Sequence, residues 1–338
     1  MNTVSIAASD ADAVAVAVAM DEVDRGLVHA LQIDGRAPFR TVAEVLGVSE
    51  NTVARRYRRL RSAGVLRVVG VVNGVLLGST SWTLRIQCTP DAAGAIAGSL
   101  AARSDTSFVY LLSGGTEISC NVQTPSAAER DALLLHKLPR TSRVTAVSAH
   151  LLLRATALPN DWAGSARLSV EQVDRLRPAP PSPGDGPVVL DDQDRAMLKI
   201  LLRDGRAGYT ELAAAVGGAD STAKRRLDAL RRAGVLTYAV DIAPAALGFP
   251  TEARLWMSVR PSKLSDAAHE LAGHPEVSFA AMTTGPSNLV AAVNCRSADD
   301  LCRYLTERVA ALDAVRSLET APVIRTLKRT GSCLPAAR

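Results

Sequence analysis

Apolar residues recur at helical spacing near the start of the chain, and the pattern predicts three short helices. Their ranges are 24–31, 40–46, and 50 to 61 or 62. Ser49 is a suitable N-cap for the third helix. Within that helix, Val53, Tyr57 and Leu60 fall at i, i+4 and i+7, which indicates one buried stripe. Three short helices with a tight turn before the last are typical of a helix-turn-helix.

The face of the third helix opposite this stripe is polar and basic. At 100° per residue it carries Asn51, Arg55 and Arg58, flanked by Ala54 and Arg59. A solvated helix surface can have the same composition, but here a capped basic helix follows a tight turn. We therefore predict that the third helix enters the major groove of DNA.

The same design occurs twice in the chain. Residues 21–66 align with residues 191–236 without a gap, and the Asp-Gly-Arg-Ala sequence of residues 34–37 returns at residues 204–207. An ungapped repeat of this length indicates a duplicated domain. His29 aligns with Lys199 and is expected at the surface.

In the second copy, the third helix has the same buried stripe, formed by Ala223, Leu227 and Leu230. Its outward positions are Ser221, Arg225, Asp228 and Arg232. The two outward faces differ, because Asp228 stands where the first copy has Arg58. A carboxylate repels phosphate but accepts a hydrogen bond from the amino group of cytosine. The sequence therefore predicts an operator with two unlike half-sites.

One pair of arginines has two interpretations. Arg56 and Arg226 lie at the flank of the buried stripe in their helices. Each can contact DNA, or each can pair with a carboxylate of the first helix, such as Asp24 or Asp194. The pattern leaves both interpretations open.

Beyond each helix-turn-helix the pattern changes to short strands and helices. Residues 67–72 are expected as a strand or wing leaving the first one. The order βαββαβ then follows at residues 81–88, 91–102, 107–112, 116–123, 126–138 and 144–154, and again at residues 254–259, 263–272, 277–282, 289–295, 298–311 and 315–324. This order predicts an α+β protein in which two winged-helix-like helix-turn-helix domains are each followed by a ferredoxin-like domain.

The predicted domain boundaries follow from the same pattern and from composition. They are a disordered lead-in at 1–20, helix-turn-helix domains at 21–73 and 191–243, ferredoxin-like domains at 80–155 and 250–328, a Pro-rich linker at 156–190, and a tail at 329–338. Within the linker, residues 168–176 are expected to form a short helix. Residues 177–187 contain five prolines and form a semi-extended spacer of roughly 30 Å. Such a spacer lets the ferredoxin-like halves pair within one chain or between chains.

Charge and cysteine content exclude several classes of protein. The net charge of +5 and the pI near 9.1 are consistent with an anionic partner. The five cysteines are odd in number and lack C-x-x-C spacing, so neither a zinc site nor a disulfide framework is expected. This cysteine usage predicts a protein of the reducing cytoplasm. Residues 1–20 contain no Lys or Arg, unlike a signal peptide, and no apolar run is long enough to span a membrane.

The sequence of the first copy resembles that of a known family of DNA-binding proteins. The residues at 23–36 (VDRGLVHALQIDGR), 48–56 (VSENTVARR) and 63–66 (AGVL), with Leu60, resemble the DNA-binding domain of the Lrp/AsnC family, the leucine-responsive or feast/famine transcriptional regulators. Taken as two units in tandem, the resemblance covers almost the whole chain, with the ferredoxin-like halves as the weaker match. It implies a cytoplasmic regulator that binds double-stranded DNA and forms a homo-oligomer or an intrachain pseudo-dimer.

The resemblance also implies a candidate effector site. In the family the ferredoxin-like sheets pair face to face, and a Gly-x-x-Asp loop between the central strands holds an amino acid in several members. The corresponding loops here end in Glu117 and Asn288 instead of aspartate. The candidate effector residues are Gly114, Gly115, Glu117, Gly285, Ser287 and Asn288. Both loops are equally consistent with simple Gly-rich β-turns.

Enzyme classes find little support in the sequence. No two of the five histidines have metal-ligand spacing, and no P-loop or nucleophile-elbow pattern occurs, so neither catalysis nor a cofactor is expected. One alternative comes from resemblance, because siroheme decarboxylases share the two-domain plan and retain His and Arg residues in the ferredoxin-like half. Around residues 278–282 no His/Arg cluster is evident.

The predicted DNA-binding residues all lie on the two third helices. They are Asn51, Thr52, Arg55, Arg56, Arg58, Arg59, Ser221, Thr222, Lys224, Arg225, Arg226 and Arg232. Base contacts would specify the sequence, and the arginines would also hold phosphates.

Overall fold

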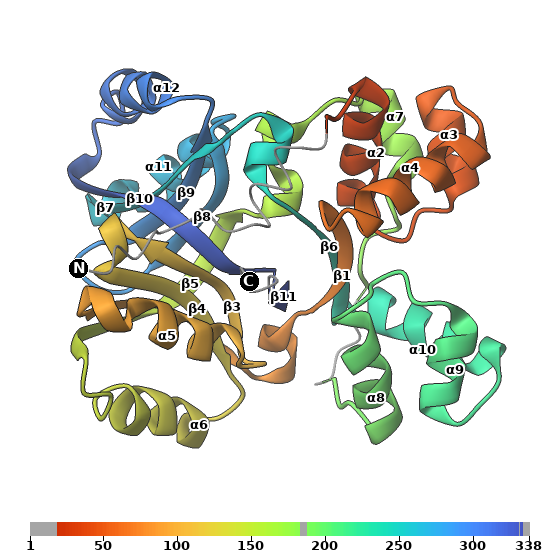
Figure 1. Cartoon of the computed structure of the whole chain (residues 1–338), viewed down its shortest axis with the longest axis horizontal. Coiled ribbons are helices and arrows are strands. Elements are labelled where there is room, and N and C mark those ends of the chain that lie inside the picture. Colours follow the sequence, from red (N-terminus) through yellow and green to blue (C-terminus); the bar gives the residue numbers. More distant parts are fainter. Residues whose placement is uncertain (1–18, 183–187, 331, 334–338) are drawn as a thin grey trace, which may run out of the picture.

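The computed structural model describes residues 19–182, 188–330 and 332–333; most of the predicted lead-in lies outside the described residues. The three predicted helices are confirmed in each copy, and the two helix-turn-helix units lie side by side in Figure 1. The first unit contains α2 (Glu22–Ile33), α3 (Phe39–Leu46) and α4 (Glu50–Ser62). The second contains α8 (Asp192–Leu201), α9 (Tyr209–Val216) and α10 (Asp220–Arg232).

Local sequence sets the tight turn before α4. Gly47 ends α3 in the left-handed conformation with φ of 67°, which a glycine adopts without strain. The Ser49 side chain then accepts from the backbone N–H of Thr52 at 3.1 Å and caps α4. Val53, Tyr57 and Leu60 are buried, as their spacing predicts. The second copy keeps the glycine turn at Gly217, but its N-cap is Ala219, which offers no side-chain cap.

The expected wing takes a different form. β1 (Leu66–Val72) does not form a wing within its own unit but pairs antiparallel with β6 (Leu236–Ile242), the strand that follows the second unit. The register runs from Leu66 opposite Ile242 to Val72 opposite Leu236. An exposed strand edge needs a partner, and the duplicated unit supplies an equivalent one. The ladder joins the two units about a pseudo-two-fold axis (Figure 1).

The repeated Asp-Gly-Arg-Ala sequence forms a reciprocal contact across this axis. Arg36 Nη1 donates to the carbonyl oxygens of Gly205 at 2.8 Å and Ala207 at 3.0 Å. Arg206 donates in return to two carbonyl oxygens of the first copy, at 2.7 and 3.0 Å: Gly35 and Ala37. The aspartates also cross over, since Arg61 pairs with Asp204 at 2.6 Å and Arg231 with Asp34 at 3.1 Å. We call these residues the arginine clasp.

The glycines of the clasp allow the close approach of the two units. A Cβ on Gly205 would lie 2.9 Å from the backbone carbon of Val69, and one on Gly35 would lie 2.6 Å from Tyr238 Cβ. Gly205 N–H also donates to the carbonyl of Val68 at 2.8 Å. The repeat therefore encodes an interface as well as a domain.

The ferredoxin-like halves are confirmed as βαββαβ units. The first contains β2 (Thr80–Cys88), α5 (Pro90–Ala101), β3 (Thr106–Leu112), β4 (Glu117–Thr124), α6 (Ala127–Asp131), which continues as a π-helix to Lys137, and β5 (Val144–Ala157). The second contains β7 (Thr251–Val259), α11 (Leu264–Ala272), β8 (Val277–Thr283), β9 (Leu289–Cys295), α12 (Ala298–Arg303), with a π-helical continuation to Val309, and β10 (Val315–Arg329). A short β11 (Ser332–Cys333) pairs with the end of β10 in the expected tail.

The two sheets join into one closed ring. β5 pairs with β2 through Leu151 and then with β8 from Leu152 to Ala157, and β10 pairs with β7 before it continues along β3 from Val323. Both strands outrun the lengths expected from sequence because their far ends find partners in the other half. The halves therefore pair within one chain, which the sequence left open.

Apolar side chains fill the space between the two sheets. Tyr110, Leu112, Trp256, Ala281 and Val290 form a buried cluster there, while separate cores lie between each sheet and its own helices. Each sheet is therefore covered on both faces, which accounts for strands with few exposed apolar positions.

Part of the expected linker is folded onto the first helix-turn-helix unit. Trp162, Leu168 and Leu176 join its core, and α7 (Val170–Leu176) packs on α2 and α3. His29 is half-buried rather than at the surface, because its Nδ1 accepts the N–H groups of Arg167 and Leu168, each at 3.0 Å. We call residues 162–176, which pack on this unit, the strap.

Among the described residues, no helix is long and apolar enough to cross a membrane, and no group of three His, Cys, Asp or Glu could hold a metal ion.

The arginine clasp generates a stability prediction. Arg206→Met removes two hydrogen bonds from a charged donor to buried carbonyls, and should lower the free energy of unfolding by about 2–3 kcal/mol. Arg203→Met, at an exposed arginine of the same loop region, should change it by less than about 0.5 kcal/mol. Urea titration followed by circular dichroism measures both, and equal losses would contradict a special role for Arg206.

His29 generates a pH prediction. Burial, and secondarily the charge of Arg167, lowers the pKa of His29, so the folded state favours the neutral ring that accepts the strap's N–H groups. The stability from this contact is complete above the unfolded pKa of about 6.5 and is lost as pH falls through the lower folded value. The protection factors of residues 166–176 against hydrogen exchange, which are corrected for the intrinsic rate at each pH, should therefore fall on acidification.

A His29→Gln variant is the matched control, because its side-chain oxygen accepts hydrogen bonds but does not titrate. Its strap should exchange at a rate that depends on acidification only through the intrinsic chemistry. If wild type and variant respond alike, His29 does not control the strap.

Candidate nucleic-acid interface

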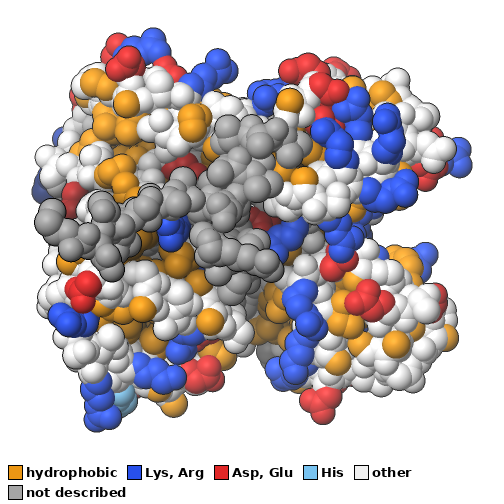
Figure 2. Space-filling view, in the orientation of Figure 1, with side chains coloured by type: hydrophobic (Ala, Val, Ile, Leu, Met, Phe, Trp, Pro, Cys, Tyr) orange, Lys and Arg blue, Asp and Glu red, His pale blue; other side chains and the backbone are white. Residues whose placement is uncertain are grey.

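The outward face of α4 is open and basic. Asn51, Arg55 and Arg58 are exposed, and the outward residues together line one shallow surface hollow that also includes Thr52, Arg59, Arg61 and Ser62. Figure 2 shows basic side chains over the part of the surface where α4 lies in Figure 1. Arg58 Nε touches only the Ala54 carbonyl of its own helix, and Arg55 forms no hydrogen bond with a described residue. Both guanidinium groups are available to phosphate or base edges.

Two further arginines of α4 are tied to the start of α2. Arg56 pairs with Asp21 at 2.7 Å and with Asp24 at 3.0 Å, and Arg59 pairs with Asp24 at 2.5 Å. Asp24 is only 1% exposed, so these contacts hold α4 against α2. The hydrogen bonds that Arg56 donates to Asp21 and Asp24 raise the pKa of Arg56. Of the two interpretations of Arg56, the structure therefore favours the carboxylate pair.

α10 likewise carries one arginine paired with carboxylates and several exposed cations. Arg226 pairs with Asp191 at 2.8 Å and Asp194 at 2.9 Å, as Arg56 does with its own carboxylates. Lys224 and Arg225 are exposed and form no side-chain hydrogen bond with a described residue. Among the described residues, the Arg232 side chain donates only to the Asp228 carbonyl of its own helix. Ser221 and Thr222 stand at the N-terminal end of the same face. The exposed cations of α10 are therefore at Lys224, Arg225 and Arg232.

The first candidate effector loop is engaged in the fold. Glu117 pairs with Arg85, whose Nη2 also reaches Glu319 Oε1 of the other half at 2.5 Å and whose guanidinium lies 3.9 Å from the Trp256 ring centre. Burial lowers the pKa of Arg85, but the hydrogen bonds that Arg85 donates to Glu319 and Glu117 outweigh burial and hold that pKa above its ordinary value. Gly114 and Gly115 form the turn with φ of 74° and 89°.

The second loop is pinned in the same way. The Asn288 side chain accepts from the Val259 N–H at 2.8 Å and donates to the Val259 carbonyl at 2.9 Å. Gly285 lies against His150, where a Cβ would come within 2.3 Å of Nδ1. Ser287 accepts through its carbonyl from Thr283 Oγ1 at 2.8 Å. The polar ends of Glu117 and Asn288 therefore have partners within the fold, and an effector role for the two loops stays a prediction.

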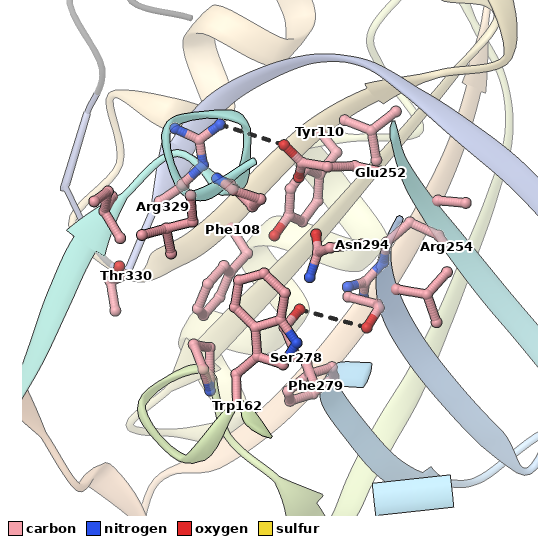
Figure 3. A pocket seen from close by; sticks show the side chains of 18 of the residues that line it. Phe108, Tyr110, Trp162, Glu252, Arg254, Ser278, Phe279, Asn294, Arg329 and Thr330 are labelled. Carbon is pink, nitrogen blue, oxygen red and sulfur yellow. Dashed lines mark hydrogen bonds and ion pairs between the residues drawn. The ribbon is translucent and has the colours of Figure 1, made fainter. Parts of the chain in front are cut away.

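A cavity that sequence reasoning missed lies between the two sheets. Its volume is about 70 Å³, and its walls come from both halves and from the β6 segment. Figure 3 shows Arg254, Asn294 and Tyr110 around it, together with the aromatic rings of Phe108, Trp162 and Phe279. In the sequence, Arg254 is the first residue of a predicted strand. The one signal that could have identified it is a charged residue at a position that the alternating pattern places inward.

Comparison with protein families identifies the parts of the chain. The AsnC-type helix-turn-helix domain matches at residues 20–61 and again at 190–231, and the Lrp/AsnC ligand binding domain matches at residues 252–333. These matches cover both recognition-helix units and the second ferredoxin-like half.

Known sequences of about half this length are similar to it. An uncharacterized HTH-type transcriptional regulator of Pyrococcus abyssi is 33% identical over 145 residues, which is 43% of this chain and 91% of that protein. The regulatory protein AsnC of Escherichia coli (strain K12) is 31% identical over 147 residues, 41% of this chain and 97% of AsnC.

Solved structures match the whole fold. The crystal structure of the siroheme decarboxylase NirDL superposes with a TM-score of 0.61 at 15% identity, over 91% of this chain and 93% of that one. Its co-complex with an iron-uroporphyrin III analogue gives a TM-score of 0.62 at 16% identity, over 94% and 95%. At this identity the likeness establishes the tandem architecture and leaves function to the sequence relatives and the site.

The duplicated helix-turn-helix units, the ligand-binding domain and the regulators that are about a third identical over some 145 residues lead to one conclusion. The chain belongs to the Lrp/AsnC family, with two family units in tandem on one polypeptide.

Proposed function

We propose that the chain is a sequence-specific DNA-binding transcription regulator whose two units act as a covalent pseudo-dimer. The observation that carries this proposal is the division of the basic residues on α4 and α10. On α4 two arginines, and on α10 one, are bound to carboxylates at the start of the first helix, while other cations stay exposed on the outward face. If the outward faces were only solvated surfaces, the same separation of paired and exposed cations would not be expected in both copies.

The residues have distinct proposed roles. Asn51 and Thr52, with Ser221 and Thr222, stand at the N-terminal ends of the helices, where recognition helices contact base edges. The exposed cations would bind phosphates and bases: Arg55, Arg58, Lys224, Arg225 and Arg232. Arg56, Arg59 and Arg226 would position the helices. On this proposal the chain acts in the cytoplasm, without catalysis or cofactor.

A small-molecule effector is part of the proposal. The match to the ligand binding domain implies such a molecule, and an amino acid bound at the Gly114–Glu117 and Gly285–Asn288 turns is the family-based candidate. Release of Glu117 from Arg85 or of Asn288 from Val259 would be needed to free the polar groups of these turns.

The siroheme decarboxylase alternative has one observation in its favour, the match of the whole tandem fold. The sequence relatives count against it, because the regulators are 31–33% identical to parts of this chain, whereas NirDL is 15% identical. We therefore favour the regulator.

The regulator proposal predicts a change in salt dependence. Arg55→Ala combined with Arg225→Ala should weaken binding to duplex DNA and reduce the slope of log affinity against log salt by about 2, one for each lost phosphate contact. Mobility-shift titrations at several salt concentrations measure both quantities. Arg140→Ala with Arg316→Ala removes the same charge at exposed positions away from α4 and α10 and should leave the slope unchanged.

Equal slopes for the two double variants would mean that these arginines do not touch phosphate. The same preparations, titrated with siroheme and followed by absorbance, separate the two candidate functions. If the chain binds the tetrapyrrole and binds no DNA duplex at low salt, the regulator proposal is wrong.

The unlike reading faces predict unlike half-sites. Selection from random duplexes should return an asymmetric operator, because Arg58 and Asp228 occupy equivalent positions with opposite charge. Asp228→Arg should change base preference in one half-site only and leave the other as in wild type. A perfect inverted repeat protected equally by both units would contradict this prediction.

A further inference from the structure

The cavity between the sheets contains a charge that the rest of the interior does not compensate. Arg254, on β7, is 3% exposed and points into the space between Tyr110 and Phe279, whose ring centres lie 5.2 and 5.6 Å from its guanidinium carbon. No described carboxylate forms an ion pair with it, and its Nε has no hydrogen-bond acceptor. Burial lowers the pKa of Arg254, which reflects the same desolvation.

Neighbouring buried cations have ion-pair or hydrogen-bond partners. Arg329 Nη2 lies 3.7 Å from Glu252 Oε1, and Lys328 Nζ donates to the Arg103 carbonyl at 2.6 Å. Figure 3 shows the Arg329–Glu252 pair on the far side of the cavity from Arg254. The carboxylate nearest in sequence to Arg254 is thus already shared with another cation. This leaves the cavity with one uncompensated positive charge.

A second donor lies beside this charge without an acceptor. Asn294, on the adjacent strand β9, is 2% exposed, and its Nδ2 forms no hydrogen bond with a described residue. Asn294 is the cross-strand neighbour of Glu252, two residues from Arg254 on the same face of β7. A buried polar group without a partner costs about 1–3 kcal/mol, and more when charged, so two such donors converging on one cavity point to an acceptor that fills it.

We propose that Arg254 and Asn294 bind the carboxylate of a short organic monoanion, such as propionate, in the cavity between the sheets. The ligand carries a single negative charge because Arg254 supplies the one uncompensated cation. Its body is apolar, since the aromatic rings of Phe108, Trp162 and Phe279 line the cavity beside these two donors. Its size is limited to about five non-hydrogen atoms, because a water-sized atom needs roughly 10–15 Å³ of a cavity of about 70 Å³.

The site does not depend on the proposed DNA binding, and its test needs no DNA. Thermal unfolding of the full chain in sodium propionate should show a Tm higher by about 3 °C than in equimolar sodium chloride, once the ligand is well above its Kd. Propionamide has the same shape without the charge and should give no rise. Isothermal titration with propionate should give one site per chain.

Arg254→Met distinguishes the site from a general salt effect. Removing an uncompensated buried charge should raise the Tm of the ligand-free protein and abolish the response to propionate. Arg316→Met, at an exposed arginine of β10, should keep the wild-type response. Arg254→Lys retains the charge but not the planar donor pair, and should keep a weakened response.

Three results would overturn the proposal. They are equal Tm values in propionate and propionamide, an equal rise in chloride and propionate, and a wild-type propionate response in Arg254→Met. The first would mean that the cavity holds only water, and the second that any anion acts. The third would place the anion elsewhere, and none of the three bears on DNA binding.

Discussion

The exchange of strands between the two halves is the constraint on which the rest of the structure depends. β1 and β6 pair only with each other, and β5 and β10 each complete their own sheet and then extend along the other. One edge of each linking strand, and the edges that each ferredoxin-like sheet would leave open, are covered by strands of the duplicate. A single unit would therefore expose both its linking strand and the apolar inner face of its sheet. The tandem chain supplies both partners at once, without the entropy loss of bringing two chains together.

The arginines of the helix-turn-helix units serve two purposes that their sequence positions do not separate. Arg36 and Arg206 join the two units, because their side chains donate to backbone carbonyls across the pseudo-two-fold axis. Arg56 and Arg226 join the third helix of each unit to the first by ion pairs. These side chains orient the basic faces of α4 and α10. A DNA-reading surface needs such rigidity, because base contacts specify sequence only when the helix is held in a defined orientation.

Duplication has also allowed the halves to diverge at equivalent positions. The strand registers place Arg254 at the position of Thr83, and Trp256 at the position of Arg85. Arg85 and Trp256 meet across the inner space, where the guanidinium lies over the indole ring. Arg254 also lies against aromatic rings, those of Tyr110 and Phe279, but unlike Arg85 it forms no ion pair with a described carboxylate. A symmetric dimer of identical chains would have to carry this charge twice.

Much of this protein follows from its sequence alone, because the features concerned are local. The period of the apolar residues, the Gly47 turn and the Ser49 cap specify the helix-turn-helix within one stretch of chain, and the βαββαβ order follows from alternation. The tertiary structure decided what depends on long-range partners. These are the pairing of β1 with β6, the extra length of β5 and β10, the docking of the strap on His29, and the burial of Arg254. Such contacts join residues far apart in the chain, and no local pattern records which strand edge a given strand will meet.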